Sequence, residues 1–360
     1  MNQIDERDTL FARLALKPDS EQFNEYYNRN PHLLEIDRQL RKENSITDFS
    51  GNLNPDSAEY LIFSSINKTT MMIRDYMAID ARTERSEKQL KMAPEKFSLH
   101  LHELLKFWGA SHSGITEVSE REFYSTSRHG KELKKHLKNT IVFAVEMNRE
   151  CINRAPYAEA MLATLEGYAE AARIGCKLSM HLKSLGFNTA LNTVFDYQAP
   201  LVWLAATAGI GEIGRNTLLV TPDTGSRIRL GAVMTDAELK FDGPIEFGLK
   251  AFCNICGRCA ENCPTRAVDR DFFSNAETLH DHQWQHDPVK CYQMWLKAKT
   301  DCGICISSCP FSQGVNAETL EAMKNKPEQL KNYLEKLIQH SGKRNFTGKT
   351  LPILSGTSRP

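Results

Sequence analysis

The sequence predicts a mixed α/β domain followed by a small, cysteine-rich module. Apolar segments of strand character alternate with segments of helical period over about the first 245 residues, which is typical of α/β or α+β folds. Eight of the ten cysteines then fall within 57 residues, so they indicate one site rather than scattered core positions. A chain of 360 residues is long enough for about two domains with cores of their own.

The composition argues against nucleic acid or a membrane as a partner. Lys and Arg number 45, and Asp and Glu number 45, so no net charge attracts the chain to a polyanion. No apolar run reaches the ~18 residues that span a bilayer. The first residues contain neither a twin arginine nor an apolar export segment. We therefore expect a cytoplasmic protein, a setting in which disulfides are rare.

The first helices and strands follow from local patterns. Residues 97–108 have the period of an amphipathic helix, with a turn at Gly109 and a short strand near 114–118. The basic run 131–138 also has a helical period and favours a solvated face. Residues 140–147 are β-branched, aromatic and apolar, which predicts a buried strand.

A long helix is expected next, with Pro156 in its first turn and Gly186 at its end. Residues 199–208 predict a shorter buried helix, and residues 229–235 predict another strand. After the cysteines, residues 317–340 predict a helical stretch that ends at Gly342, followed by a loop-like tail to Pro360.

These elements suggest four parts of the chain. They are an N-terminal helical segment that packs on the core (1–100), the α/β domain (101–246), the cysteine module (247–315) and a C-terminal helix and tail (316–360).

The cysteines form two motifs of related spacing. The first is Cys253-x2-Cys256-x2-Cys259-x3-Cys263-Pro264, and the second is Cys291-x10-Cys302-x2-Cys305-x3-Cys309-Pro310. This is the two-cluster pattern of bacterial ferredoxins, in which the fourth cysteine of each motif ligates the other cluster. We therefore expect two [4Fe–4S] clusters. One is held by Cys253, Cys256, Cys259 and Cys309, and the other by Cys291, Cys302, Cys305 and Cys263.

Zinc is the alternative occupant of these cysteines. Zinc ribbons use paired C-x2-C knuckles rather than a triple run closed by Cys-Pro, so the spacing favours iron–sulfur clusters. Cys151 and Cys176 lie outside both motifs, in apolar or helical surroundings, and we expect them to be packed thiols.

A glycine motif, Gly209-x-Gly211-x-x-Gly214, matches the dinucleotide fingerprint. That fingerprint requires a strand before it and a helix after it. Here a helix precedes the motif and an extended segment follows, so we reject nicotinamide binding. The glycines still indicate a sharp turn or a close backbone approach.

The block AGIGEIGRNTLLVTPDTGSRIRLGAVMTD (208–236), followed by both cysteine motifs, resembles the catalytic subunits of corrinoid-dependent reductive dehalogenases. It is more distantly similar to epoxyqueuosine reductases. The similarity covers roughly residues 101–311, and WGASHSGITEV (108–118) is a looser match.

The resemblance implies a nitroreductase-like α/β domain that binds cobalamin, and a ferredoxin-like module that feeds it electrons. The sequence lacks D-x-H-x-x-G, which agrees with a family whose corrinoid has no histidine ligand from that motif. The family's twin-arginine leader has no counterpart here, so a respiratory role is not expected.

The resemblance also implies site residues. A proton donor is expected near the corrinoid, and Tyr197 and Asp196 are the nearest candidates, Asp196 by likeness to the acid of epoxyqueuosine reductases. Candidate cofactor-binding residues come from the matching block: Gly211, Arg215, Asn216, Gly225, Ser226, Arg227 and Arg229.

The hypothesis is reductive cleavage of a carbon–halogen bond in a small organic substrate, with ferredoxin or flavodoxin as the low-potential donor. One alternative is an epoxyqueuosine reductase-like enzyme that acts on tRNA. The Glu-Arg pair of that family is missing and the net charge is zero, although a patch around residues 131–138 would favour tRNA. The other alternative is a corrinoid-binding electron carrier with no small-molecule chemistry.

Overall fold

The computed structural model describes residues 3–42, 49–70, 72–270 and 284–356. The predicted N-terminal segment, cysteine module and tail each include residues outside these ranges. The predicted limits of the four parts stay a prediction.

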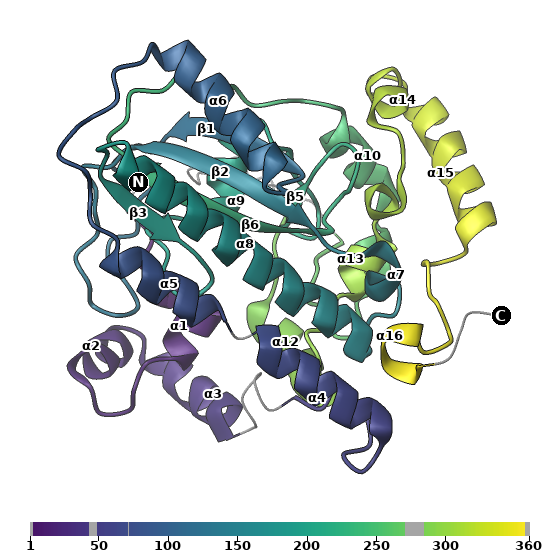
Figure 1. The fold of residues 1–360 in the computed structure, drawn as a ribbon. Coiled ribbons are helices and arrows are strands. Elements are labelled where there is room, and N and C mark those ends of the chain that lie inside the picture. Colours follow the sequence, from purple (N-terminus) through teal and green to yellow (C-terminus); the bar gives the residue numbers. More distant parts are fainter. Residues whose placement is uncertain (1–2, 43–48, 71, 271–283, 357–360) are drawn as a thin grey trace.

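An antiparallel sheet of four strands forms the centre of the molecule (Figure 1). The spatial order is β1 (His112–Glu117), β2 (Asn139–Glu146), β6 (Ile228–Thr235) and β3 (Thr189–Asn192). Every neighbouring pair runs antiparallel. The strands expected near 114–118, 140–147 and 229–235 are therefore confirmed.

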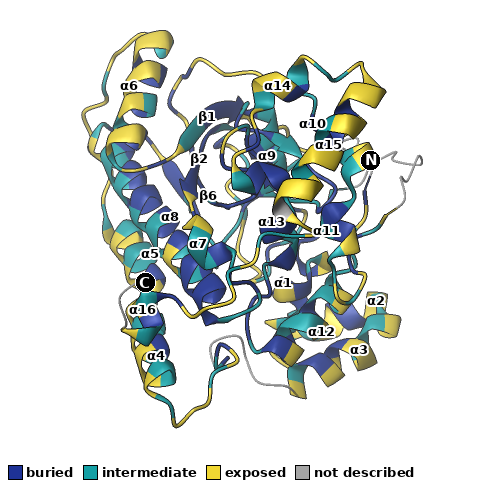
Figure 2. Ribbon diagram, turned by 90° about the vertical axis from the view of Figure 1, so that its right-hand side faces the viewer, coloured by how far each residue is buried: buried dark blue, intermediate teal, exposed yellow. Residues whose placement is uncertain are grey.

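Both faces of this sheet are buried, as the apolar run of β2 requires. Ile141, Phe143 and Val145 pack into one hydrophobic cluster, and the intervening Val142 and Ala144 pack into another. This alternation follows from the two-residue period of a strand. The sheet is accordingly the darkest part of the molecule when residues are coloured by burial (Figure 2).

Helices cover the two faces. On one face α8 (Ala158–Ser184) runs along the sheet, with α6 (Pro94–Phe107) and α5 (Ile73–Arg82) beside it (Figure 1). On the other face α9 (Leu201–Thr207) packs against β2 and β6. The helices expected at 97–108 and 199–208 are confirmed, and Gly109 has the left-handed backbone of a turn, with φ +100°.

The N-terminal helices gather at one end of the molecule, in purple and dark blue in Figure 1. They are η1 (Glu6–Asp8), α1 (Leu10–Leu14), α2 (Glu21–Arg29), α3 (Pro31–Lys42) and α4 (Ala58–Thr70). Phe63 of α4 packs with Met161 and Leu162 of α8, so this segment rests on the main domain.

Short helices and the turns between them form the part of the chain around the cysteines. The helices are α7 (Arg149–Ile152), which packs against α13, then α10 (Leu249–Cys256), α11 (Arg258–Glu261), α12 (Pro288–Ala298), α13 (Ile304–Ser308) and η3 (Pro310–Gln313). Between α9 and β6 the chain forms a small hairpin of β4 (Glu212–Ile213) and β5 (Leu219–Val220). The glycine motif thus leads from a helix into a hairpin, and the rejection of a dinucleotide fold agrees with this.

Several local predictions are wrong. Residues 131–138 form a loop rather than a helix, because Lys131 and Lys134 are bound to residues 189–198 instead of to their own turn. Pro156 lies before Tyr157, the N-cap of α8, rather than in the first turn.

The C-terminal part also differs from its prediction. The single expected helix is divided into α14 (Ala317–Glu321) and α15 (Pro327–Ser341), since Pro327 lacks the N–H that a continuous helix needs. The tail contains α16 (Pro352–Ser355), and Leu354 of this helix is buried. Within the described ranges, no helix combines the length and apolarity needed to cross a bilayer.

Candidate active site

The structure brings the eight motif cysteines together in two sets. Cys253, Cys256 and Cys259 interact electrostatically with Cys309. Cys291, Cys302 and Cys305 interact in the same way with Cys263. We call these the first and the second cysteine set. Each contains the last cysteine of the other motif, as the ferredoxin spacing predicts, and the sets lie near enough for Cys259 and Cys305 to interact electrostatically.

Left-handed backbone conformations shape these loops. Gly257 has φ +61° and separates α10 from α11. Cys302 and Gly303 have φ +61° and +71° before α13 begins. Positive φ reverses the chain over one or two residues, so each loop turns sharply between its cysteines.

Burial sets the chemistry of the thiols. It raises the pKa of Cys259 and Cys305 well above the ordinary value, and that of Cys291 to about 11. A bound metal core supplies the positive charge that makes thiolates stable in such a place. Within the described ranges, no three His, Cys, Asp or Glu side chains converge as they would on a single metal ion.

Arg215 lies against the first cysteine set. Its Nη2 and Nε donate to the carbonyl oxygen of Cys253 at 2.7 and 3.1 Å, and Nη1 donates to the carbonyl oxygen of Arg270. The residue is 4% exposed. It therefore holds the first cysteine loop and places a positive charge beside these thiols.

The other residues of the matching block pack on the chain itself. Arg227 donates to the carbonyl oxygens of Ser312 and Met147 and pairs with Glu146. Asn216 donates to the hydroxyl of Ser226. These contacts join the hairpin to the end of the second cysteine motif.

Gly211 and Gly225 are needed for close backbone approach. A Cβ on Gly225, whose φ is +62°, would lie 2.3 Å from Ser312 N, and one on Gly211 would lie 2.3 Å from Val220 O. Their expected role in cofactor binding stays a prediction.

A cavity of about 280 Å³ lies between α8, α9 and β6. It is lined by Tyr124, Tyr168, Tyr197, Pro200, Leu201, Val202, Leu218, Leu219, Ser226, Ile228, Arg229 and Leu230. The lining is thus aromatic and aliphatic with a single cation. Such an apolar cavity with a few polar groups is the usual form of a ligand site.

Arg229 is the cation of this cavity. Its Cζ lies 4.9 Å from the centre of the Tyr168 ring, and its Nη2 donates to Thr164 Oγ1 at 3.0 Å. Asp301 lies on its other side, with 3.8 Å between Nη2 and Oδ2. Arg229 Nε and Asp301 Oδ1 are buried and have no hydrogen-bond partner within the described chain. Buried polar atoms of this kind call for a partner from a ligand or water.

Two residues connect the cavity to the second cysteine set. Leu218 lines the cavity and packs in the same hydrophobic cluster as Cys305. Asp301, which faces Arg229, directly precedes Cys302 in the sequence. The cavity and these thiols therefore share neighbouring residues.

The structure separates the two predicted proton donors. Tyr197 lines the cavity, and burial holds its pKa well above the ordinary value. Asp196 instead forms an ion pair with Lys131, with 2.8 Å between Oδ2 and Nζ, and it is not among the lining residues. The catalytic role of either residue stays a prediction.

The sequence analysis missed Tyr124, Tyr168 and Asp301. Tyr168 has the helical spacing of a core residue, so its period hides its position at the cavity. The remaining cysteines match their prediction: Cys176 is buried, and Cys151 packs beside Ile152 and Leu218.

The cysteine module matches a known family of domains. Residues 252–313 match the model of the 4Fe-4S dicluster domain family, so this part of the chain is of the dicluster iron–sulfur type.

The relatives are then more specific. The chain is 32% identical over 183 residues to the tetrachloroethene reductive dehalogenase of Sulfurospirillum multivorans, covering 49% of this chain and 36% of that protein. It is 34% identical over 145 residues to the epoxyqueuosine reductase of Lactococcus garvieae, covering 39% of this chain and 40% of that protein. Both predicted resemblances are confirmed. The chain matches less than half the length of each of these relatives.

A solved structure shows the same fold. A catabolic reductive dehalogenase in complex with 3-bromo-4-hydroxybenzoic acid matches 96% of this chain with a TM-score of 0.72, at 18% identity and over 47% of its own length. The predicted fold class, a reductive dehalogenase-type α/β domain with a cluster-binding module, is confirmed.

Proposed function

We propose that this protein is a reductive dehalogenase-like oxidoreductase that cleaves a carbon–halogen bond of a small organic substrate. One observation carries the proposal: the cavity with Arg229 and its tyrosines lies directly beside the second cysteine set, through Leu218 and Asp301. This arrangement supports a substrate site near a site for an electron carrier. The likeness to reductive dehalogenases supports the same reading.

The overall reaction is balanced by two electrons and one proton. The carbon–halogen bond breaks, a carbon–hydrogen bond forms and the halide leaves as an anion. The electrons arrive singly from a low-potential donor such as ferredoxin or flavodoxin. The protein must therefore conduct electrons, deliver a proton and receive an anion.

The two cysteine sets are the proposed ligands of two [4Fe–4S] clusters. The first set, beside Arg215, receives electrons, and the second set, beside the cavity, passes them on. Neighbouring thiols Cys259 and Cys305 connect the two sets. Thiolate ligation and nearby charge tune the potentials of such clusters.

The cavity, at about 280 Å³, is smaller than a whole corrinoid, and we propose that it forms one part of a corrinoid site. Among the described lining residues, the polar groups are tyrosine and serine hydroxyls and a guanidinium, none of which is a usual ligand of cobalt. The orphaned Nε of Arg229 and Oδ1 of Asp301 are suited to polar groups on a ligand. When bound, cobalamin supplies a reducible cobalt centre for the carbon–halogen cleavage.

The residues around this cavity handle the proton and the halide. Arg229 provides positive charge for the leaving anion. Tyr168, whose ring centre lies 4.9 Å from Arg229 Cζ, is the proton donor that we propose. Tyr197, the candidate from the sequence, has a cation at 5.8 Å, the guanidinium of Arg128. Burial raises the pKa of Tyr197 although Arg128 and Arg229 oppose this rise. A cytoplasmic location stays a prediction.

Two alternatives differ in substrate. An epoxyqueuosine reductase-like enzyme would act on tRNA, and the 34% identity over 145 residues favours it. Its acid would be Asp196, which Lys131 engages outside the cavity. A corrinoid-binding electron carrier would lack turnover of either substrate.

Anaerobic purification with added cobalamin, followed by iron, sulfide and cobalt analysis, is the first test. About eight irons and one cobalt per chain are expected for two cubanes and one corrinoid. Eight irons without cobalt would contradict the proposed function and leave the clusters intact.

Turnover with reduced flavodoxin then separates the alternatives. We expect halide release from 3-bromo-4-hydroxybenzoic acid or a related halophenol and no reduction of epoxyqueuosine in tRNA. The reverse result would establish the tRNA enzyme. Cobalt binding without turnover of any substrate would indicate the carrier.

A further inference from the structure

A buried glutamate far from the cavity in sequence holds one of the cavity walls. Glu6 lies in η1 and is 1% exposed. Its Oε2 accepts from the backbone N–H of Arg128 at 2.7 Å, and its Oε1 accepts from Arg128 Nε at 2.5 Å. Two backbone hydrogen bonds join the same segments, from Glu6 N to Thr126 O and from Ser125 N to Ile4 O. Residues 4–6 are therefore bound along their length to the loop 124–128.

That loop in turn forms the cavity. Tyr124 lines it, and its N–H donates to the carbonyl oxygen of Gln198 at 3.0 Å. Arg128 Cζ lies 5.8 Å from the centre of the Tyr197 ring. The guanidinium of Arg128 thus lies between the carboxylate of Glu6 and a tyrosine of the cavity.

The buried carboxylate of Glu6 depends on its pairing with Arg128. A buried carboxylate must be paired, and removal of its partner leaves an uncompensated charge. The η1 turn that carries Glu6 is itself fixed by a second network, in which Arg7 pairs with Asp5 and Glu25. The carboxylate of Glu6 therefore has a defined position from which it can orient Arg128.

We propose that Glu6 is a positioning residue of the active site, which fixes Arg128 and through it the wall made by Tyr124 and Tyr197. The inference rests on the proposed function only in taking this cavity as the place where the substrate or cofactor binds. Glu6 touches neither, so it acts through Arg128 alone. The N-terminal helices are then part of the catalytic unit rather than a cover over it.

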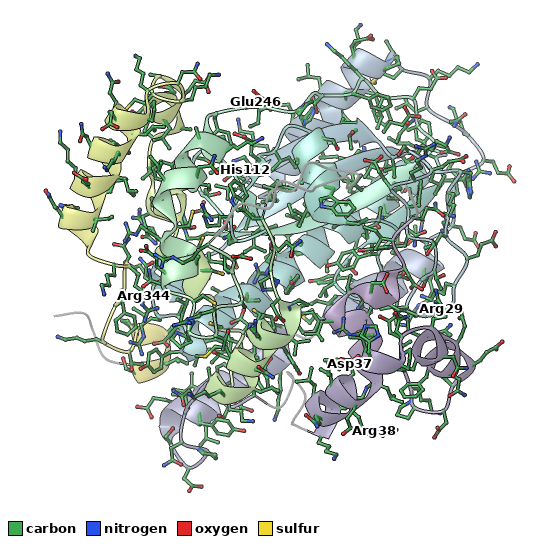
Figure 3. The ribbon with its side chains drawn as sticks, turned by 180° about the vertical axis from the view of Figure 1, so that it is seen from behind. Arg29, Asp37, Arg38, His112, Glu246 and Arg344 are labelled. Atoms are coloured by element: carbon green, nitrogen blue, oxygen red, sulfur yellow. The ribbon has the colours of Figure 1, made fainter. Side chains whose placement is uncertain are left out.

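Asp37 provides a matched control. It is also fully buried in the N-terminal helices, where it pairs with Arg13 at 2.8 Å and accepts from the hydroxyl of Tyr27. Its described partners lie within the same segment, and Figure 3 shows it on the N-terminal helices next to α2. Loss of either acid removes one buried ion pair, but only Glu6 reaches the cavity wall.

The test is hydrogen exchange of the cluster-loaded, anaerobically purified protein, compared for wild type, Glu6→Gln and Asp37→Asn. We expect Glu6→Gln to speed amide exchange in residues 123–130 and 195–199 at least about tenfold. Asp37→Asn should change these segments less than about twofold, although it lowers thermal stability. Unchanged exchange in Glu6→Gln, or an equal rise in both variants, overturns the inference.

A second variant covers the case in which Glu6→Gln does not fold. Arg128→Gln removes the same pair from the other side and should speed exchange in the same segments. Normal exchange there in Arg128→Gln contradicts the inference. The double variant should add less than the sum of the two single effects, since both disrupt one interaction.

Cobalamin binding separates this inference from the proposed function. If the cavity holds cobalamin, Glu6→Gln should weaken its binding about tenfold and Asp37→Asn should leave it unchanged. Faster exchange in a protein that binds no cobalamin would leave the positioning role standing and would contradict the proposed function.

Discussion

Two tyrosines of the cavity differ in their surroundings. Tyr168 faces the guanidinium of Arg229, whereas burial dominates the pKa of Tyr197 and raises it. We expect Tyr168→Phe to lower kcat about 100-fold or more, the usual effect of losing a general acid, with less change in KM. Tyr197→Phe should keep most of the activity.

Steady-state halide release of both variants is the measurement. Cluster and cobalt contents serve as controls for intact protein. A 100-fold loss of kcat in Tyr197→Phe, with normal kcat in Tyr168→Phe, would show that Tyr197 is the proton donor, as expected from the sequence.

Arg215 adds one positive charge beside the first cysteine set. Reduction adds an electron to a cluster, and a nearby cation favours it. Arg215→Gln should therefore lower the potential of that cluster by about 50 mV, which is about 1 kcal/mol for one electron. Redox titration followed by EPR detects the shift.

Arg13→Gln is the control for Arg215. Arg13 is also buried but pairs with Asp37 in the N-terminal helices, so its loss should reduce stability without moving either potential. Equal potentials in wild type and Arg215→Gln would remove the electrostatic role.

At the scale of elements, α6 and α8 meet through two histidines. The Nε2 atoms of His100 and His181 are 3.1 Å apart, so one donates to the other. Burial and the neighbouring His100 lower the pKa of His181 below 6.5. The unfolded chain then binds more protons than the folded one just below pH 6.5, so stability is present above that pH and falls as pH drops.

The measurement is the melting temperature of wild type and His181→Gln between about pH 7.5 and 5.5. The wild type should lose stability more steeply over this window than the variant. Parallel curves for the two proteins would show that the His100–His181 contact makes no pH-dependent contribution.

The elements also show what local patterns can and cannot reveal. Strand β2 and the long helix α8 can be predicted from the sequence because their apolar patterns persist over many residues. The loop 131–138 has a helical period, but contacts with residues 189–198 override it. Tyr168 was readable as part of α8 but not as part of a cavity, because the cavity is formed only when β6 and the loop 124–128 pack around it.

At the scale of the whole molecule, the spacing of the cysteines led us to expect that each set takes its last cysteine from the other motif. The structure brings these thiols near one another, and their role as cluster ligands stays a prediction. Arg229 and Asp301 could not be paired from sequence. They are 72 residues apart (301 − 229), and only the docking of the cysteine module on the main domain brings them to 3.8 Å.

Each cluster is expected to take its fourth ligand from the other motif, and this can be tested by substitution. Cys309→Ser should remove the first cluster and Cys263→Ser the second, each leaving about four irons per chain. Cys176→Ala, a buried thiol outside both sets, should keep about eight.

The identity of the surviving cluster decides between crossed and uncrossed ligation. In Cys263→Ser, the reduction potential of the surviving cluster should still change when Arg215→Gln is added. In Cys309→Ser, the potential of the surviving cluster should not change when Arg215→Gln is added. The opposite pattern would show that each motif holds its own cluster.

The position of Leu218 affects how electrons and protons can move near the cavity. Leu218 lines the cavity and packs against the same hydrophobic cluster as Cys305, and an aliphatic side chain offers no hydrogen bonds along which protons can move. Electrons can tunnel across such a side chain, whereas protons must enter from the side of the tyrosines. In the proposed reaction, electrons and protons would therefore reach the substrate by different routes, and a polar residue in place of Leu218 would give protons a path on the side of the cysteines.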